Sequence, residues 1–396
     1  MERTTKPIPI GLKKDWSKVY MKKNIPVFEP VFGREEAKAV LSALKDKAIS
    51  GLYGEYLEKF ENEFSRYSGC KYGVATNSGT TALHVAIAAL GIGPGDEVLV
   101  STFTNMATCF AVIYQGAKVV PIDIDPDTWN INPELIERKI NRKTKAVLIV
   151  HIFGHPCDMV PIMKIAKKHK LFVIEDCAEA HGATCNGKNV GSFGDMGCFS
   201  FYANKIITTG EGGMITTNNR RLYDLSKSLK SLAFGRKQRF MHKNIGFGYR
   251  MTNLQAAFGC AQLKKIDNFI TLKRKIAKFY KNALYNVSGL QLPVEKDYAR
   301  NVYWMYHILV HKAFGLSRNE LMKKLAKYRI ETRESFIPYN MQSIFIKKGW
   351  TKASECPVAN YVGKTGLYLP TGTSLTQKNL HYIVKTIKEI QKGKNL

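Results

Sequence analysis

Lys205 is the residue of this chain whose sequence neighbours best suit a catalytic group. It ends the apolar run FSFYANK (199–205) and precedes the glycine-rich segment TTGEGGM (208–214). A lone lysine in an apolar setting is what Schiff-base chemistry at a carbonyl group requires. Upstream, Asp176 ends a buried strand-like segment, where an unpaired carboxylate would be costly, so we expect Asp176 to face a cation.

A turn that could bind a phosphate lies earlier in the chain. The motif NSGTTAL (77–83) follows a strand-like apolar segment and opens a helix, so its free backbone amides and the positive helix end face outward together. We expect Gly79, Thr80 and Thr81 to form this turn. A simple Ser or Thr cap on a buried helix would use the same residues, and Asp176 could instead cap a helix or pair with an arginine.

Lysine, carboxylate and phosphate turn together are the set that pyridoxal phosphate needs, with the protonated pyridine nitrogen as the partner of Asp176. Glu179 and His181 follow Asp176 on the same turn, close enough to touch the same ligand. We therefore expect an enzyme in which Lys205 and Asp176 are the catalytic groups.

The composition allows this interpretation. The chain has 396 residues, of which 45% are hydrophobic, and is long enough for two domains with a sizeable core. Its eight cysteines are scattered without a C-x-x-C pair, as expected of small buried hydrophobes in a reducing compartment, so we expect a cytoplasmic protein. The first residues lack an apolar signal region, and no run of about 18 apolar residues occurs, so we expect no membrane association.

The formal net charge of +28 raises an alternative of another class, a non-catalytic polyanion-binding or regulatory protein. Lysine far outnumbers arginine, and its short runs, such as 167–168 and 323–324, are typical of a solvated surface. No zinc knuckle, RNA-recognition signature or basic leucine pattern accompanies them, so we expect no nucleic-acid partner. A protein of that class also has no reason to keep a lysine, an aspartate and a phosphate turn in register. Attraction of a diphosphate-bearing substrate is the simpler use of the charge.

Two histidines are candidate metal ligands, His151 and His155, with Cys157 and Asp158 close behind. Helical spacing would present both imidazoles on one face, but Gly154 and Pro156 work against a helix here. We expect a structural turn and no metal.

Apolar β-rich segments alternate with amphipathic ones from residue 74 onward. The predicted strands are 97–101, 118–122, 146–150, 172–175, 198–201 and 214–217, and the helices between them are 80–90, 106–115, 133–140 and 161–169. This alternation is typical of an α/β fold, with a mainly parallel sheet covered by helices on both faces. Function then belongs at the carboxyl ends of the strands.

The pattern changes after about residue 260, where we expect long basic helices and a second, smaller α+β domain. The predicted parts are a polar N-terminal arm (1–24), a large domain (25–260) and a small C-terminal domain (261–396). In the last of these we expect helices at 262–286, 317–328 and 377–391 and a strand at 302–310.

An ordered series of motifs from about residue 25 to residue 390 resembles the sugar aminotransferase family also called DegT/DnrJ/EryC1/StrS. The motifs are NSGTTAL, GDEV, TFTNMAT, IEDCAEAHGA, GSFGD, FSFYANK, GEGGM, GFGYRMTNLQAA and GLYLP. The resemblance implies a fold-type I enzyme that depends on pyridoxal 5′-phosphate and works as a homodimer with active sites at the subunit interface. It also implies transfer of an amino group, with glutamate as the expected donor, to a nucleotide-linked keto sugar.

The resemblance assigns roles to individual residues. Lys205 matches the Schiff-base lysine and Asp176 the aspartate under the pyridine nitrogen, while Ser200 joins the turn 79–81 at the phosphate. Glu179 stands where many members have Gln near the cofactor's 3-hydroxyl. His181 falls in the A-H-G-A turn beside the sugar site.

Two positions depart from the family pattern. Asn105 replaces an aromatic residue that stacks on the pyridine ring in many members, so the Asn amide or Phe103 is expected to cover the ring. Gly248 replaces an Asn that reaches the cofactor phosphate of the other subunit. Tyr249 and Arg250 remain beside it as expected substrate-binding residues that cross into the partner's site.

Three segments are most similar to the branch of the family that aminates C4 of GDP-4-keto-6-deoxymannose: HIFGHPCDMVPI, EDCAEAHGA and NKIITTGEGGM. Branches that act on UDP- or dTDP-linked keto sugars share most of these strings and remain alternatives, because loops decide sugar specificity. A dehydratase of the same fold would have histidine in place of the lysine, and Lys205 argues against it.

Overall fold

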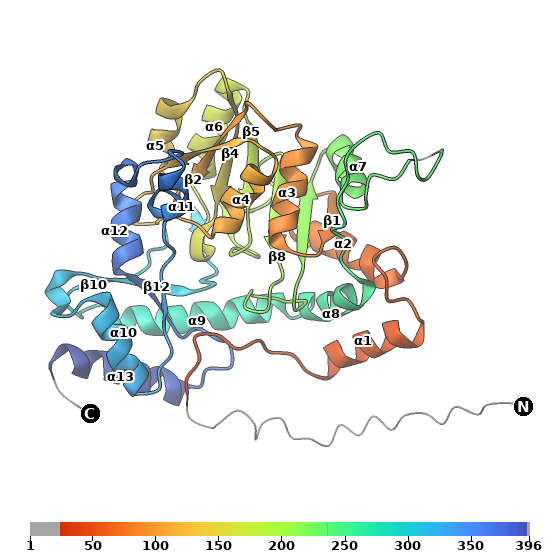
Figure 1. Cartoon of the computed structure of the whole chain (residues 1–396). Coiled ribbons are helices and arrows are strands. Elements are labelled where there is room, and N and C mark those ends of the chain that lie inside the picture. The colour runs from red at the N-terminus through yellow and green to blue at the C-terminus, as the bar shows by residue number, and fades with distance from the viewer. Residues whose placement is uncertain (1–23, 236, 394–396) are drawn as a thin grey trace, which may run out of the picture.

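The computed structural model describes residues 24–235 and 237–393 (Figure 1). The polar arm predicted for residues 1–24 lies, except for Asn24, outside the described residues.

A seven-stranded sheet in the order β1-β9-β8-β5-β4-β2-β3 forms the centre of the molecule. Its strands are β1 (Tyr72–Thr76), β2 (Glu97–Ser101), β3 (Lys118–Ile122), β4 (Thr144–Val150), β5 (Phe172–Asp176), β8 (Met196–Ser200) and β9 (Gly213–Thr217). Neighbouring strands from β3 to β8 are parallel, whereas β9 is antiparallel to both β8 and β1. The predicted α/β class with a mainly parallel sheet is confirmed, and β2 and β3 have the bounds expected from the sequence.

Helices cover both faces of this sheet (Figure 1). The helices of this part of the chain are α1 (Arg34–Lys45), α2 (Glu55–Tyr67), α3 (Gly79–Ala89), α4 (Met106–Tyr114), α5 (Pro133–Ile136), α6 (Met159–His169), α7 (Arg220–Leu229) and α8 (Asn253–Leu263). Val98 and Val100 of β2 pack in one core with residues of α3 and α4, whereas Leu99 packs in another core with residues of α5 and α6. Side chains alternate between faces along a strand, so a strand buried on both faces is a continuous apolar run.

A second sheet, in the order β10-β12-β14-β13, lies in the C-terminal part. Its strands are β10 (Leu290–Gln291), β12 (Tyr306–Val310), β13 (Arg333–Glu334) and β14 (Gly366–Leu369); the helices are α9 (Ile266–Leu284), α10 (Arg318–Lys327), α11 (Ser343–Lys347), α12 (Pro357–Thr365) and α13 (Gln377–Gln391). A third, small sheet joins β11 (Ala299–Arg300), β6 (Thr184–Cys185) and β7 (Lys188–Asn189). Single 3-10 turns occur at Glu137–Lys139, Ile152–Gly154, Lys312–Phe314, Tyr339–Met341 and Ala353–Glu355.

Three predicted elements differ from the structure by more than two residues at one end. The helix expected at 262–286 is α9, which begins only at Ile266. The first two expected residues belong to a separate helix, α8, which ends at Leu263. The strand expected at 302–310 covers only β12, because Tyr303 has a φ of 49° and interrupts the extended backbone. The helix expected at 133–140 tightens into a 3-10 turn after Ile136. The domain boundary near residue 260 stays a prediction.

Glycine allows two close approaches beside the carboxyl end of β8. A Cβ at Gly79 would lie 2.7 Å from the Cβ of Ser200, and one at Gly213 would lie 2.2 Å from the backbone oxygen of Ser78. Larger residues would separate α3 from β8 and β9. The start of α3 is therefore held directly against the sheet.

All eight cysteines are described, free and buried. Among the described helices, none combines the length and apolar character needed to cross a membrane.

A fully buried carboxylate organises the loop before β8. Glu175 accepts hydrogen bonds from the backbone amides of Gly191 (2.7 Å), Phe193 (2.8 Å) and Gly194 (2.7 Å). The Nε2 of His151 lies 3.1 Å from the same carboxylate. Because hydrogen bonds to a charged acceptor are strong, Glu175 ties this loop to the end of β5.

We predict that Glu175→Gln lowers the free energy of unfolding by about 3 kcal/mol, because the amide turns one acceptor into a donor facing backbone N–H groups. Urea denaturation followed by circular dichroism measures the change. The matched control is Glu137→Gln, a surface carboxylate beside Lys168 and His169, which should unfold close to the parent. Equal midpoints for the two variants would contradict the role of Glu175.

Candidate active site

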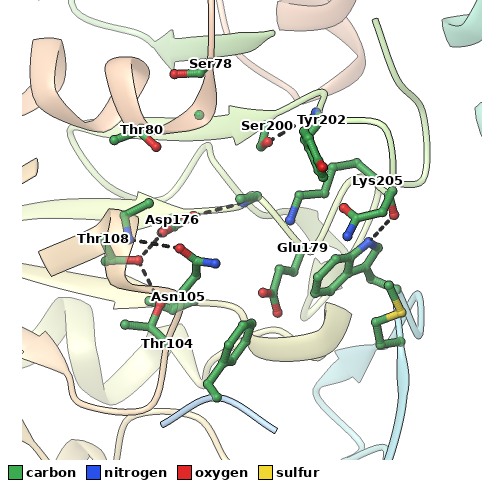
Figure 2. Close-up of a pocket in the computed structure, with 18 of the residues that line it drawn as sticks. Ser78, Thr80, Thr104, Asn105, Thr108, Asp176, Glu179, Ser200, Tyr202 and Lys205 are labelled. Atoms are coloured by element: carbon green, nitrogen blue, oxygen red, sulfur yellow. Dashed lines mark hydrogen bonds between the residues drawn. The ribbon is translucent and has the colours of Figure 1, made fainter. Parts of the chain in front are cut away.

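A cavity of about 410 Å³ opens at the carboxyl ends of the parallel strands and the N-termini of α3 and α4 (Figure 2). It brings together most of the residues predicted from the sequence: Gly79, Thr80, Asn105, Asp176, Glu179, Ser200 and Lys205 all line it. Figure 2 shows Asp176 and Glu179, from the end of β5 and the turn after it, pointing into the same space as Lys205 from the loop after β8. Its volume suits a small cofactor.

The first turn of α3 offers backbone donors to this cavity. Ser78 caps the helix, because its Oγ accepts a hydrogen bond from the amide of Thr81 at 3.2 Å. The amides of Gly79 and Thr80 precede the first intrahelical bonds and so are available to an anion. Ser200, at the end of β8, lines the cavity beside them.

Asp176 ends β5 and is held on both oxygens. Thr108 Oγ1 donates to its Oδ2 at 2.7 Å, and the amide of Ala178 donates to its Oδ1 at 3.1 Å. Burial raises the pKa of Asp176, while these hydrogen bonds and the Lys205 charge act in the opposite direction. A cation placed in the cavity would stabilise the ionised carboxylate.

Lys205 lies in the loop after β8, with its ammonium over an indole. Its Nζ is 3.9 Å from the ring centroid of Trp304. The Trp304 ring is fixed because its Nε1 donates to the carbonyl of Asn204 at 2.7 Å. Burial lowers the pKa of Lys205, opposed by Glu179 and Asp176, so a neutral, nucleophilic amine is favoured relative to a lysine in water.

Glu179 has one carboxylate oxygen engaged, which accepts from the amide of Phe153 at 2.7 Å. Burial raises the pKa of Glu179 to about 7, against the attraction of Lys205. A protonated carboxyl is therefore accessible near neutral pH, and it can donate a hydrogen bond as a Gln amide would.

Four predicted site residues do not line this cavity. Thr81 turns its Oγ1 to Asn77 Oδ1 at 2.7 Å and shapes the turn from behind. His181 is fully buried against the rings of Phe64, Phe199 and Phe201, and burial lowers its pKa to about 3. Its position does not support direct contact with a substrate in this cavity, and that role stays a prediction.

The other two lie on the segment between α7 and α8. Tyr249 Oη is 3.2 Å from His84 Nδ1, and Arg250 donates to Ser231 Oγ at 3.3 Å. Both lie outside the cavity of their own chain, and their role in a partner's site stays a prediction.

Asn105 has a structural role that its sequence position did not suggest. Its Oδ1 accepts from the amide of Ala107 at 3.0 Å and caps α4, while the residue also lines the cavity. Phe103, the other candidate to cover the ring, is buried behind the cavity against Phe153 and Phe336.

Sequence reasoning missed much of the cavity wall, including Thr108, Trp304 and Arg333. Thr108 lies in the quoted TFTNMAT motif, one helical turn after Thr104, and its Oγ1 is 2.7 Å from Thr104 Oγ1. That spacing was the available signal. Trp304 and Arg333 come from the C-terminal part, and no local pattern connects them to the site.

The two histidines weighed as metal ligands are engaged in other contacts. His151 lies within 4.8 Å of Glu175 and Cys177, but its Nδ1 accepts from the amide of Cys157 at 3.0 Å. The oxygens of Glu175 are also occupied by backbone donors. His155 Nδ1 faces the carbonyl of Pro156 at 2.8 Å. A metal ion at His151 would have to displace these bonds.

The polar lining fits pyridoxal phosphate. Tyr368 Oη and Asn204 Oδ1 are buried, line the cavity and have no hydrogen-bond partner among the described residues. Such groups are costly unless a ligand satisfies them. Together with the free amides of α3, the carboxylate of Asp176 and the amine of Lys205, they match the phosphate, pyridine and carbonyl ends of that cofactor.

Comparisons with known proteins show what this chain is similar to. A sequence model of the DegT/DnrJ/EryC1/StrS aminotransferase family matches residues 30–388. The chain is 42% identical to GDP-perosamine synthase of Escherichia coli O157:H7 over 373 residues, which are 94% of this chain and 100% of the relative. It is 38% identical to GDP-perosamine synthase of Caulobacter vibrioides over 367 residues, covering 92% of this chain and 98% of the relative. A solved structure of a Streptococcus pneumoniae protein in its PLP form has 26% identity and a TM-score of 0.88, covering 93% of this chain and 99% of that one.

We predict a pH-dependent stabilisation by Glu179→Gln in the cofactor-free protein. The unfolded carboxyl loses its proton near pH 4.5, whereas the folded one keeps it to about pH 7, so the parent loses stability as pH rises between these values. The variant has no such loss, and its advantage in free energy of unfolding should grow to about 3 kcal/mol by pH 7. Urea titrations from pH 4.5 to 8 measure it. A difference that does not change with pH would contradict the raised pKa.

Proposed function

Because this chain belongs to the DegT/DnrJ/EryC1/StrS aminotransferase family, we propose that it aminates C4 of GDP-4-keto-6-deoxymannose to give GDP-perosamine, with glutamate as the amino donor. The chain is a sugar aminotransferase, and its cofactor is pyridoxal 5′-phosphate. The single observation that carries the chemistry is the cavity in which Lys205 and Asp176 meet beside the N-terminus of α3.

The sugar assignment is supported by the relatives. Both GDP-perosamine synthases align along nearly their whole length with this chain, at 42% and 38% identity. This favours a GDP-linked 4-keto-6-deoxy sugar over the UDP- and dTDP-linked alternatives. A non-catalytic polyanion-binding protein is not supported, because it would not need a buried lysine that faces two carboxylates.

The residues of the cavity divide into a phosphate end and a ring end. Gly79, Thr80 and Ser200 would hold the cofactor phosphate at the helix N-terminus, with Thr81 shaping the turn. Asp176 would keep a proton on the pyridine nitrogen, and Glu179 in its protonated form would donate to the neighbouring oxygen of the ring. When bound, the cofactor takes the amino group from the donor and passes it to the keto sugar.

Lys205 then acts as nucleophile and proton carrier. Its neutral amine, favoured by burial, takes the proton from the donor's α-carbon, and Trp304 stabilises the resulting ammonium through its ring face. Thr108 holds the Asp176 carboxylate in place, where it would keep a proton on the pyridine nitrogen. Thr108, Asp176 and Trp304 are themselves buried, which shields this part of the cavity from water.

The homodimer belongs to the same proposal. The segment between α7 and α8 extends away from the rest of the molecule (Figure 1). It exposes Phe240 by 80%, Met241 by 61% and Ile245 by 89%. Apolar side chains that are so exposed on an extended segment favour burial against a second copy. Tyr249 and Arg250 would then reach the partner's cavity.

The proposed location is the cytoplasm. The eight free, buried thiols support it, since a reducing compartment preserves them. We propose that no nucleic acid or membrane takes part in the reaction.

We predict that the purified protein, given glutamate, converts GDP-4-keto-6-deoxymannose with a kcat/KM at least about tenfold above that for UDP- or dTDP-linked 4-keto sugars. Lys205→Ala should lose activity by about a thousandfold or more while keeping its circular dichroism spectrum. Lys188→Ala, which removes an exposed lysine, is the control and should match the parent. Preference for another nucleotide would overturn the sugar assignment alone, whereas an active Lys205→Ala would overturn the mechanism.

We predict that Arg250→Ala weakens sugar-nucleotide binding and that mixing it with Lys205→Ala restores activity. In a mixed dimer, one site has an intact Lys205 from one chain and an intact Arg250 from its partner. Subunit exchange after mild denaturation, followed by an activity assay, measures the recovery. Mixing two differently tagged Lys205→Ala preparations is the control. Absence of recovery would place both residues in one chain's site.

A further inference from the structure

A second cavity, of about 500 Å³, lies between α9 and the segment 293–306. Its wall includes Arg274, Lys275, Lys278 and Lys281 from α9 and Arg300 from β11. It shares no lining residue with the active-site cavity. The proposed transamination makes no use of it.

The charge of this wall is strongly unbalanced. The sequence between Asp267 and Glu295 contains no acidic residue. Glu295 is the one acid of the cavity wall, and it already pairs with Arg274. The ammonium groups of the three lysines have no hydrogen bond or ion pair to any other residue that the structure describes. Like charges three and four residues apart destabilise a helix, so this face of α9 favours an external anion.

A buried hydroxyl is also unpaired in the same wall. Tyr306 is 1% exposed, and its Oη has no partner among the described residues. Tyr306 lines the cavity, so a ligand oxygen there would accept from this hydroxyl. An oxyanion is the acceptor that the neighbouring lysines also favour.

From these observations we infer that the second cavity is an anion-binding site for a small phosphate-bearing ligand of the diphosphate class. Its volume is within the range of sites for small ligands. Three lysines along two turns of one helix match two adjacent phosphate groups better than a single one. The inference does not depend on the proposed sugar substrate.

The site lies directly behind the wall of the active site. Along one short segment, Tyr303 and Tyr306 line the second cavity, whereas Trp304 and Met305 line the first. Lys273 of α9 donates to the carbonyl of Trp304 at 2.8 Å. A ligand in the second cavity would therefore contact the residues on either side of Trp304 and Met305, and Trp304 is the residue that covers Lys205.

A further contact leads to the loop of Asp176 and Glu179. Arg300 donates to the carbonyl of Gly182 at 3.0 Å. An anion that binds Arg300 would compete for or reorient this donor. Arg300 thus connects the second cavity to the loop that carries Asp176 and Glu179.

Isothermal titration of the holoenzyme with pyrophosphate tests the inference. Lys275→Gln/Lys278→Gln/Lys281→Gln should lose one binding site per chain or weaken it by about tenfold or more. Tyr306→Phe, which removes only the hydroxyl, should weaken the same site about threefold or more and leave the fold intact. Titrations equal to the parent's for both variants would overturn the proposal.

The matched control is Lys385→Gln/Lys388→Gln/Lys392→Gln, which removes the same charge from exposed positions of α13 and its end. It should bind pyrophosphate as the parent does. An equal loss in this control would mean general attraction to a basic surface and would overturn the site.

Hydrogen–deuterium exchange locates the ligand. Pyrophosphate should slow exchange in peptides that cover residues 271–282 and 299–306 of the parent holoenzyme, and this protection should be absent from the triple variant of α9. Protection confined to residues 76–81 would assign the anion to the active site instead and contradict the inference.

Discussion

Burial of one ammonium group with two carboxylates in a single cavity is the constraint on which the rest of the structure depends. Each charge is costly there, so each has a neighbour that holds it: Thr108 for Asp176, the amide of Phe153 for Glu179, and the Trp304 ring for Lys205. These neighbours come from α4, from the turn after β4 and from the segment before β12. The cavity therefore forms only where the strand ends, the start of α4 and the C-terminal part meet.

Local motifs explain how much of this could be predicted from the sequence. The start of α3, the end of β5 and the loop after β8 each combine a strand end with the turn that follows it, so Gly79, Asp176 and Lys205 carry their signals with them. The residues that contact these groups, Thr108 and Trp304, have no such local signal. Thr108 and Asp176 are 68 residues apart, and Trp304 reaches a carbonyl 100 residues away, so only the packed structure brings them together.

The C-terminal part was harder to predict for a related reason. Tyr303 adopts a left-handed backbone that no local pattern indicates, and it shortens β12. That turn makes the segment two-sided, with one face for each cavity. Such a conformation costs free energy and persists only where packing on both sides enforces it. The left-handed turn at Tyr303 therefore both shortens β12 and brings the two cavities to opposite sides of one segment.

The eight buried cysteines can report local unfolding of the chain. Burial raises the pKa of every one of these thiols, so the reactive thiolate is suppressed in the closed molecule. A thiol reagent would therefore modify only those molecules in which a segment has opened. The cysteines are spread from Cys70 beside β1 to Cys356 before α12. The rate of labelling at each position would then measure how often that part of the chain unfolds, without introducing any new cysteine.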